Sequence, residues 1–268
     1  MVDSETVRVE RTGRVARLIV DRPDRLNALN VETLESLRAG IDEIEAGEAT
    51  DADNTPGEAR AIVLAGAGGD AFVAGADISA IQEMDTPEAQ AYAESGHDVA
   101  RRLETSDLPV VAAIDGYAFG GGSELALACD LRVASEDAVI GQTEIDLGIV
   151  PGWGGTQRLP RLVSDETARR MIFLGQRLDA ETAHEEGLVG EVAPSEAFDD
   201  RVRELAERLA DRPRFALAAA KEAINEAHEQ GLHAGLVAER RAWSGLFGTH
   251  DQREGMAAFL EDREPEFE

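Results

Sequence analysis

Two acidic residues, Glu124 and Glu144, stand out because each lies beside a glycine-rich turn. Two carboxylates that meet in one cleft can hold a water molecule between them, with one taking a proton and the other giving one. Taken alone, Glu124 would equally suit the first turn of a helix, where a negative charge is favourable. The pair therefore predicts acid–base chemistry if the fold brings both side chains to one place.

The segment that leads to Glu124 has the pattern of a strand, a turn and a helix. A buried-type strand at 109–114 precedes the triplet Gly120–Gly122, and 124–128 is a good helix opening. A helix N-terminus offers unpaired N–H groups and a partial positive charge. Glycines let a substrate oxygen approach those groups, which would stabilise an oxyanion. A packing turn between strand and helix would require the same glycines.

Other motifs do not support a competing chemistry. The glycines of 66–71 have the spacing of a dinucleotide fingerprint, but no convincing helix follows them. Ser123 lacks the second glycine of a serine-hydrolase elbow. Lys221 lies far from any glycine-rich loop that could bind phosphate. The five histidines show no metal-ligand spacing with nearby acids, so we expect no metal site.

Periodicity predicts the elements that would position the two acids. The chain is expected to be an α/β body followed by a helical tail from about residue 165. The expected strands are 6–10 and 14–20 as a hairpin, 61–65, 109–114, 131–134, 138–140 and 188–192. The expected helices are 31–46, 87–105, 167–174, 196–210, 215–229, 233–247 and 252–263. Residues 47–59 and 66–77 are predicted to be loops, the first of them acidic and solvated.

The charge of the chain excludes one class of partner. The 268 residues contain 26 Lys and Arg against 54 Asp and Glu, a formal net charge of −28, and Lys221 is the only lysine. Nucleic-acid binding depends on basic side chains that displace counterions, so we expect no nucleic-acid partner. Such an excess of carboxylates suits a halophilic protein, because salt screens self-repulsion. An ordinary acidic protein is the alternative.

The remaining composition indicates a globular cytoplasmic protein. Hydrophobic residues make up 43% of the chain, which is enough for a substantial core. Cys129 is the only cysteine, which excludes an internal disulfide and a multi-cysteine metal site. The sequence has no apolar run long enough for a membrane helix and no apolar signal core at its polar N-terminus, so we expect no membrane partner.

Several ordered motifs together give the sequence a resemblance to the enoyl-CoA hydratase (crotonase) family over nearly its whole length. They include Arg22-Pro23, Leu26–Leu29, Ala74–Ile78, Gly120–Ala126, Cys129-Asp130, Gly154–Leu159 and Arg253–Phe259. The resemblance implies a spiral α/β catalytic core of repeated ββα units over residues 1–200. It also implies a helical C-terminal region over residues 201–268 that builds a homotrimer or a hexamer.

The resemblance also implies the site and its reaction. Glu124 and Glu144 match two catalytic glutamates, and the N–H groups of Ala76 and Gly121 match an oxyanion hole. The implied reaction is hydration of a 2-enoyl-CoA thioester to a 3-hydroxyacyl-CoA, with no metal and no cofactor apart from the CoA of the substrate. The implied substrate-binding residues are Arg25, Ala74, Asp77, Ile78 and Phe259, and the acyl pocket is expected to involve 80–105 and Trp153.

Two alternatives to hydration stay open at this point. An isomerase of the same family would shift a double bond through the same enolate, but many isomerases keep only one of the two acids. A CoA-binding oligomeric scaffold without turnover would have no need of paired acids. The sequence also departs from the family pattern: Ser79 and Asp262 stand where many relatives carry a cation.

Overall fold

The structure is a computed structural model in which residues 5–47 and 58–268 are described. Most of the acidic loop expected at 47–59 lies outside these ranges. Six strands form the larger sheet in the order β1-β2-β3-β5-β7-β10. Only β1 and β2 pair antiparallel, as the expected hairpin, and the other neighbours are parallel. The strands are β1 (Val7–Thr12), β2 (Val15–Val20), β3 (Ala61–Gly66), β5 (Val110–Ile114), β7 (Leu131–Ser135) and β10 (Glu191–Ala193).

A second sheet of four short strands has the order β4-β6-β8-β9. Its members are β4 (Ala71–Val73), β6 (Tyr117–Phe119), β8 (Val139–Gly141) and β9 (Arg177–Asp179). A long strand of the first sheet leads into a short strand of the second and then into a helix, first as β3–β4–α3 and again as β5–β6–α4. This repetition confirms the expected fold of ββα units.

Side chains alternate between the two faces of the larger sheet, so each face builds its own core. In β3, Ile62 and Leu64 pack with α1 (Val31–Glu45) and α3 (Thr86–Thr105). Their neighbours, such as Val63, pack instead with α8 (Phe198–Ala210). The period of two in a strand places successive side chains on opposite faces. The expected boundary between residues 200 and 201 falls inside α8, so the part of the chain bound to the sheet continues to Ala210.

Short helices connect the layers near the second sheet. The helices here are α2 (Ile78–Ile81), α4 (Gly121–Ala128), α5 (Gly155–Leu162), α6 (Asp165–Leu174) and α7 (Ala180–Glu185). Three short 3₁₀ turns, η1 (Pro23–Arg25), η2 (Glu144–Leu147) and η3 (Ser195–Ala197), complete the body. Two of these elements, α4 and η2, carry the two candidate acids.

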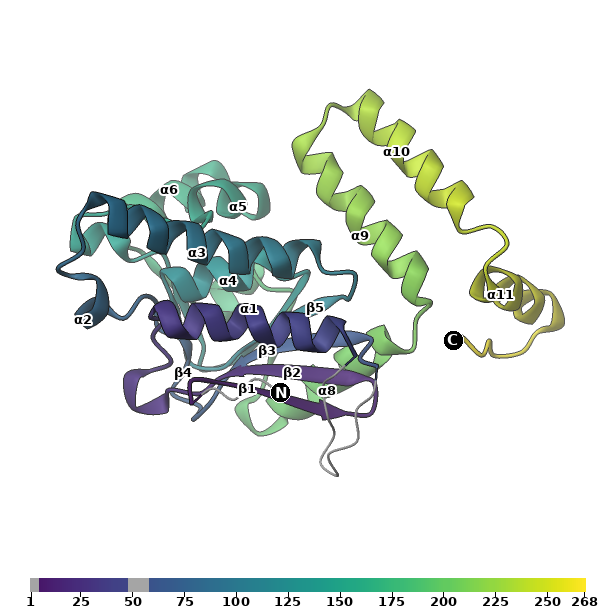
Figure 1. Ribbon diagram of the computed structural model, residues 1–268, viewed down its shortest axis with the longest axis horizontal. Helices are drawn as coiled ribbons and strands as arrows, with labels where there is room; N and C mark the ends of the chain where they lie inside the picture. The colour runs from purple at the N-terminus through teal and green to yellow at the C-terminus, as the bar shows by residue number, and fades with distance from the viewer. Residues whose placement is uncertain (1–4, 48–57) are drawn as a thin grey trace.

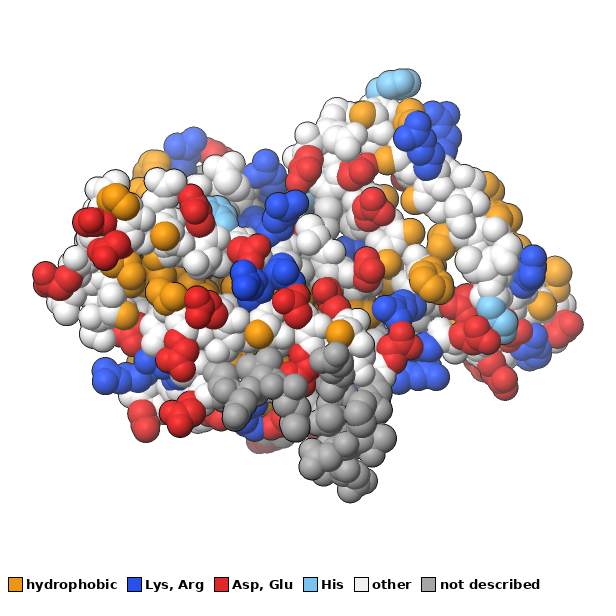
Figure 2. Space-filling view, in the orientation of Figure 1, with side chains coloured by type: hydrophobic (Ala, Val, Ile, Leu, Met, Phe, Trp, Pro, Cys, Tyr) orange, Lys and Arg blue, Asp and Glu red, His pale blue; other side chains and the backbone are white. Residues whose placement is uncertain are grey.

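The last three helices project from the body as an arm (Figure 1). They are α9 (Arg214–Glu229), α10 (Leu232–Gly245) and α11 (His250–Glu261). Lys221 ties α9 to the body, because its Nζ donates to Leu103 O at 2.9 Å and forms an ion pair with Asp130 at 2.8 Å. Hydrophobic side chains lie on the surface of the arm (Figure 2), among them Trp243 and Phe259, which are 65% and 86% exposed. None of the described helices is long and apolar enough to cross a membrane.

Candidate active site

A cavity of about 600 Å³ opens between the second sheet, α3 and η2. Glu124 and Glu144 both line it, together with Ala76, Gly121 and Trp153. Most of the remaining wall is apolar and comes from α2, α3 and the segment after η2, with side chains such as Ile81, Met84, Tyr92 and Ile149. The cavity therefore combines two acids with a wall suited to a hydrocarbon chain.

Glu124 is held by the backbone of the turn that opens α5. Its side chain is 2% exposed, and its Oε1 accepts hydrogen bonds of 2.7 Å from the N–H groups of both Trp153 and Gly155. Gly154 between them has φ +112°, a conformation that glycine adopts readily. Burial raises the pKa of Glu124 above its ordinary value, and the N–H donors partly offset that rise by stabilising the carboxylate.

Glu144 has a different environment although it lines the same cavity. It is 9% exposed, and neither of its carboxyl oxygens has a hydrogen-bond partner within the described part of the chain. Burial, together with a smaller effect of the negative charge of Glu124, raises its pKa from 4.5 to about 7. A Cβ added at Gly120, directly before α4, would lie 3.4 Å from Glu144 Oε1. The fold thus brings Glu144 to the end of the helix that carries Glu124, with a proton it can exchange near neutral pH.

Ala76 and Gly121, which line the same cavity, have unpaired backbone amides. Gly75 has φ +108°, and a Cβ there would lie 3.1 Å from Phe119 O, so the segments before Ala76 and Gly121 are in close contact. One amide next to each of these residues is occupied, because Asp77 N donates to Leu29 O and Gly120 N donates to Gly141 O. No hydrogen bond among the described residues uses the N–H of Ala76 or that of Gly121, the first residue of α4. These two donors can therefore bind a carbonyl oxygen that develops negative charge.

The comparison with known proteins identifies the family. The profile of the enoyl-CoA hydratase/isomerase family matches residues 10–268.

The chain belongs to this family.

Solved structures and curated sequences of the enoyl-CoA hydratase family resemble the chain over nearly its full length. It is 40% identical to a short-chain-enoyl-CoA hydratase of Clostridium acetobutylicum, over 99% of this chain and 98% of that protein. It is 37% identical to a crotonyl-CoA hydratase of Syntrophomonas wolfei, over 98% of both chains. The crystal structure of an enoyl-CoA hydratase from Bacillus anthracis has a TM-score of 0.90 and 37% identity, with 98% of each chain covered.

Six of the nine site residues expected from the family resemblance line this one cavity. The six are Ala74, Ala76, Ile78, Gly121, Glu124 and Glu144. Trp153, expected at the acyl pocket, lines it too, as do Ile81, Met84, Ala89, Tyr92 and Ala93 from residues 80–105.

The other three expected site residues do not line the cavity. The carboxylate of Asp77 binds Ser79 at 2.6 Å and Arg22 at 3.0 Å, and these partners lower its pKa. Its side chain therefore connects the loop of Ala76 to Arg22. Arg25 is exposed on η1, and Phe259 is exposed on α11 in the projecting arm.

Sequence reasoning missed the residues that hold Glu124 in place. Arg158 donates to Trp153 O at 2.9 Å, and two further nitrogens of its guanidinium bind Glu104 on α3 at 3.2 and 2.8 Å. Arg158 thus fixes the turn whose N–H groups donate hydrogen bonds to Glu124. The glycine-rich segment 151–159 marked this turn as unusual, but nothing in its spacing indicated its target. Nowhere in the described chain are three or more His, Cys, Asp or Glu side chains grouped to hold a metal ion.

Proposed function

We propose that the chain is an enoyl-CoA hydratase, which adds water across the 2,3 double bond of a 2-enoyl-CoA thioester to give a 3-hydroxyacyl-CoA. One observation carries the proposal: two buried carboxylates line the cavity into which two unpaired amides can donate. The relatives named short-chain-enoyl-CoA hydratase and crotonyl-CoA hydratase support it. The two acids also favour hydration over isomerisation and over a scaffold without turnover.

In the proposed reaction, the thioester carbonyl oxygen accepts hydrogen bonds from Ala76 N–H and Gly121 N–H. These donors stabilise the enolate that forms when a nucleophile adds to C3, and one such donor is typically worth about 2.7–4 kcal/mol of barrier. Because Gly75, directly before Ala76, is in close contact with the backbone directly before α4, little reorganisation of the two donors is needed when charge develops. The site supplies this stabilisation through the main chain alone.

The two glutamates divide the proton transfers according to their surroundings. Glu124, whose carboxylate form is stabilised by two N–H donors, takes a proton from the bound water as its oxygen bonds to C3. Glu144, with a pKa raised to about 7, gives its proton to C2. The elements of one water are then added, and a proton passed from Glu124 to Glu144 restores the starting state. No metal or redox cofactor takes part in this scheme. CoA is not counted as a cofactor, because it is part of the substrate.

The CoA portion of the substrate would extend from Ala74 and Ile78, at the cavity wall, towards Arg25. Arg25 is exposed and forms no ion pair with the residues that the structure describes, so its guanidinium is available for a phosphate. Phe259 would reach a substrate only on a neighbouring subunit, because its own helix projects from the body (Figure 1).

The projecting arm supports assembly into a homotrimer, or a hexamer of two trimers. Its exposed apolar side chains include Phe215, Trp243, Phe259 and Leu260. An apolar surface of this kind is typical of an interface that is covered in the assembled protein. Light scattering coupled to size exclusion tests this part of the proposal: a mass near one chain of 28.7 kDa at micromolar concentration contradicts it.

Two further properties of the enzyme belong to the proposal. The net charge of −28 and the single lysine support adaptation to concentrated salt, where the screening length falls to about 3 Å at 1 M. The single cysteine, Cys129, is buried and supports a cytoplasmic location.

The experiment that tests the reaction compares two substrates in the same buffer. Crotonyl-CoA should lose its enoyl-thioester absorbance as water adds, whereas a 3-enoyl-CoA should gain that absorbance only if the double bond is shifted. We expect rapid loss with crotonyl-CoA and a much slower gain with the 3-enoyl thioester. No turnover of crotonyl-CoA, or faster turnover of the 3-enoyl thioester, contradicts the proposal.

A further inference from the structure

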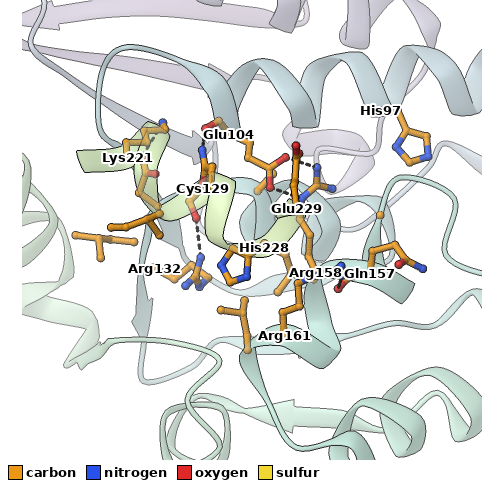
Figure 3. Close-up of a pocket in the computed structure, with 18 residues that line it drawn as sticks. His97, Glu104, Cys129, Arg132, Gln157, Arg158, Arg161, Lys221, His228 and Glu229 are labelled. Atoms are coloured by element: carbon orange, nitrogen blue, oxygen red, sulfur yellow. Dashed lines mark hydrogen bonds and ion pairs between the residues drawn. The ribbon is translucent and has the colours of Figure 1, made fainter. Parts of the chain in front are cut away.

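A second cavity, of about 530 Å³, lies next to the proposed active site (Figure 3). It is bounded by α9 on one side and by α3, α4 and α5 on the other. The described residues that line it include none of those proposed to catalyse hydration, and no role has been given to it so far.

Four of its charged side chains form two ion pairs. Arg158 binds Glu104 in the wall, and Lys221 forms an ion pair with Asp130 at 2.8 Å. Figure 3 shows Glu104, Arg158 and Lys221 among the side chains that line the pocket. The wall also contains apolar side chains, namely Leu127, Ala128, Leu131, Leu162 and Ile224. These apolar side chains give the cavity a surface that a hydrocarbon chain can contact.

Three separate elements each contribute residues to the walls of both cavities. Helix α3 lines the first cavity with Ala93 and the second with His97, one turn further on. Helix α4 lines the first with Glu124 and the second with Ala128. In the turn before α5, Trp153 lines the first cavity and the next residue, Gly154, lines the second. The cavities are therefore neighbours along all three elements.

The indole ring of Trp153 lies between α3 and α4, the two helices that line both cavities. The ring fills space that a side chain at either of two glycine positions would need. A Cβ added at Gly96 of α3 would lie 2.1 Å from the ring, and one added at Gly121 of α4 would lie 2.3 Å from it. Tyr92 packs against the ring edge to face, with centroids 5.4 Å apart. Trp153 is 4% exposed. The two glycines thus create a slot between α3 and α4 that the ring fills.

We propose that Trp153 is a partition that limits the length of the acyl chain, so that the enzyme prefers short-chain 2-enoyl-CoA thioesters. The inference rests on the proposed function. With the carbonyl at Ala76 and Gly121 and C3 between the two glutamates, the rest of the chain must occupy the apolar remainder of the first cavity. The ring closes that space towards the second cavity. Removal of the ring should join the two cavities and admit longer chains.

The test measures kcat/KM for crotonyl-CoA, hexenoyl-CoA and decenoyl-CoA with the wild type, Trp153→Leu and Trp153→Phe. The ratio of decenoyl to crotonyl values cancels a general loss of activity. It should be low in the wild type and rise at least about tenfold in Trp153→Leu, since space for one methylene is worth about 10–200-fold in a pocket. Trp153→Phe should give a smaller rise, and it serves as the test if Trp153→Leu does not fold. Phe198→Leu, a large-to-small change in the core on the far face of the sheet, should leave the ratio unchanged.

Failure of this inference can be distinguished from failure of the proposed function. If the wild type hydrates none of the thioesters, the proposed function is wrong. If it hydrates crotonyl-CoA but uses decenoyl-CoA equally well, the partition is wrong. An unchanged ratio in a folded Trp153 variant also overturns the inference, and so does an equal rise in Phe198→Leu.

Discussion

Replacement of Glu144 by Gln should stabilise the fold while it stops the reaction. Glu144 is 9% exposed and lacks hydrogen-bond partners among the described residues, and burial raises its pKa from 4.5 to about 7. Between pH 4.5 and about pH 7 the folded state binds more protons than the unfolded state. The free energy of unfolding therefore falls as the pH rises through this range. At about 1.36 kcal/mol for each pKa unit, the ionised side chain costs the fold about 3 kcal/mol at pH 8. Below pH 4.5 that cost is absent.

Urea unfolding of the wild type and Glu144→Gln at pH 4 and pH 8 measures this difference. Salt and protein concentration must be held constant, because both affect a charged oligomer. We expect Glu144→Gln to raise the free energy of unfolding by about 3 kcal/mol at pH 8 and by little at pH 4. Glu185→Gln, on the exposed surface of α7, is the matched control and should change neither value. An equal gain at both pH values, or no gain at pH 8, would refute the reasoning.

Three further predictions follow from the site and the composition. The kcat/KM for hydration of crotonyl-CoA should fall as pH rises through about 7, because Glu144 then loses the proton it donates; a flat profile across pH 6–9 would contradict this. Arg158→Lys should lower kcat by about 10- to 100-fold with little change in KM, since a less well-held turn misplaces Glu124; an unchanged kcat would rule out the positioning role. The melting temperature should rise steeply from dilute buffer to molar salt, because screening relieves the repulsion within a net charge of −28, and a melting temperature indifferent to salt would refute halophilic adaptation.

Periodicity was sufficient to predict the long elements of the fold. The alternating run of β2 and the helical spacing in α1 and α3 lie close to where they were expected, because each buries one regular face in the core. Three of the four strands of the second sheet were missed, with β4 expected as part of a loop, whereas β8 was expected at 138–140. Strands β4, β6 and β9 have three residues each, too few to show a period, and parallel pairing between distant segments leaves no local pattern. Helix α5 was also missed, since it contains Pro160 and begins among glycines.

The site was only partly readable from the sequence. Glycines next to Glu124 and Glu144 indicated close backbone approach, but only the family resemblance indicated that the two acids share one site. Backbone contacts between distant segments cannot be inferred from composition. The hydrogen bonds from Trp153 N–H and Gly155 N–H to Glu124 therefore became visible only in the structure. For the same reason Asp77 could not be recognised beforehand as a partner of Arg22.

The central claim is that Glu124 and Glu144 act on one shared water, and a double-mutant cycle tests it most directly. The kcat for crotonyl-CoA hydration is measured for Glu124→Gln, Glu144→Gln and the double variant, with binding of a saturated acyl-CoA as the control for an intact site. Each single change should lower kcat by about 100- to 10,000-fold, and the double variant should be no slower than about the worse single variant. Near-normal turnover in either single variant, or losses that multiply in the double variant, would contradict the claim.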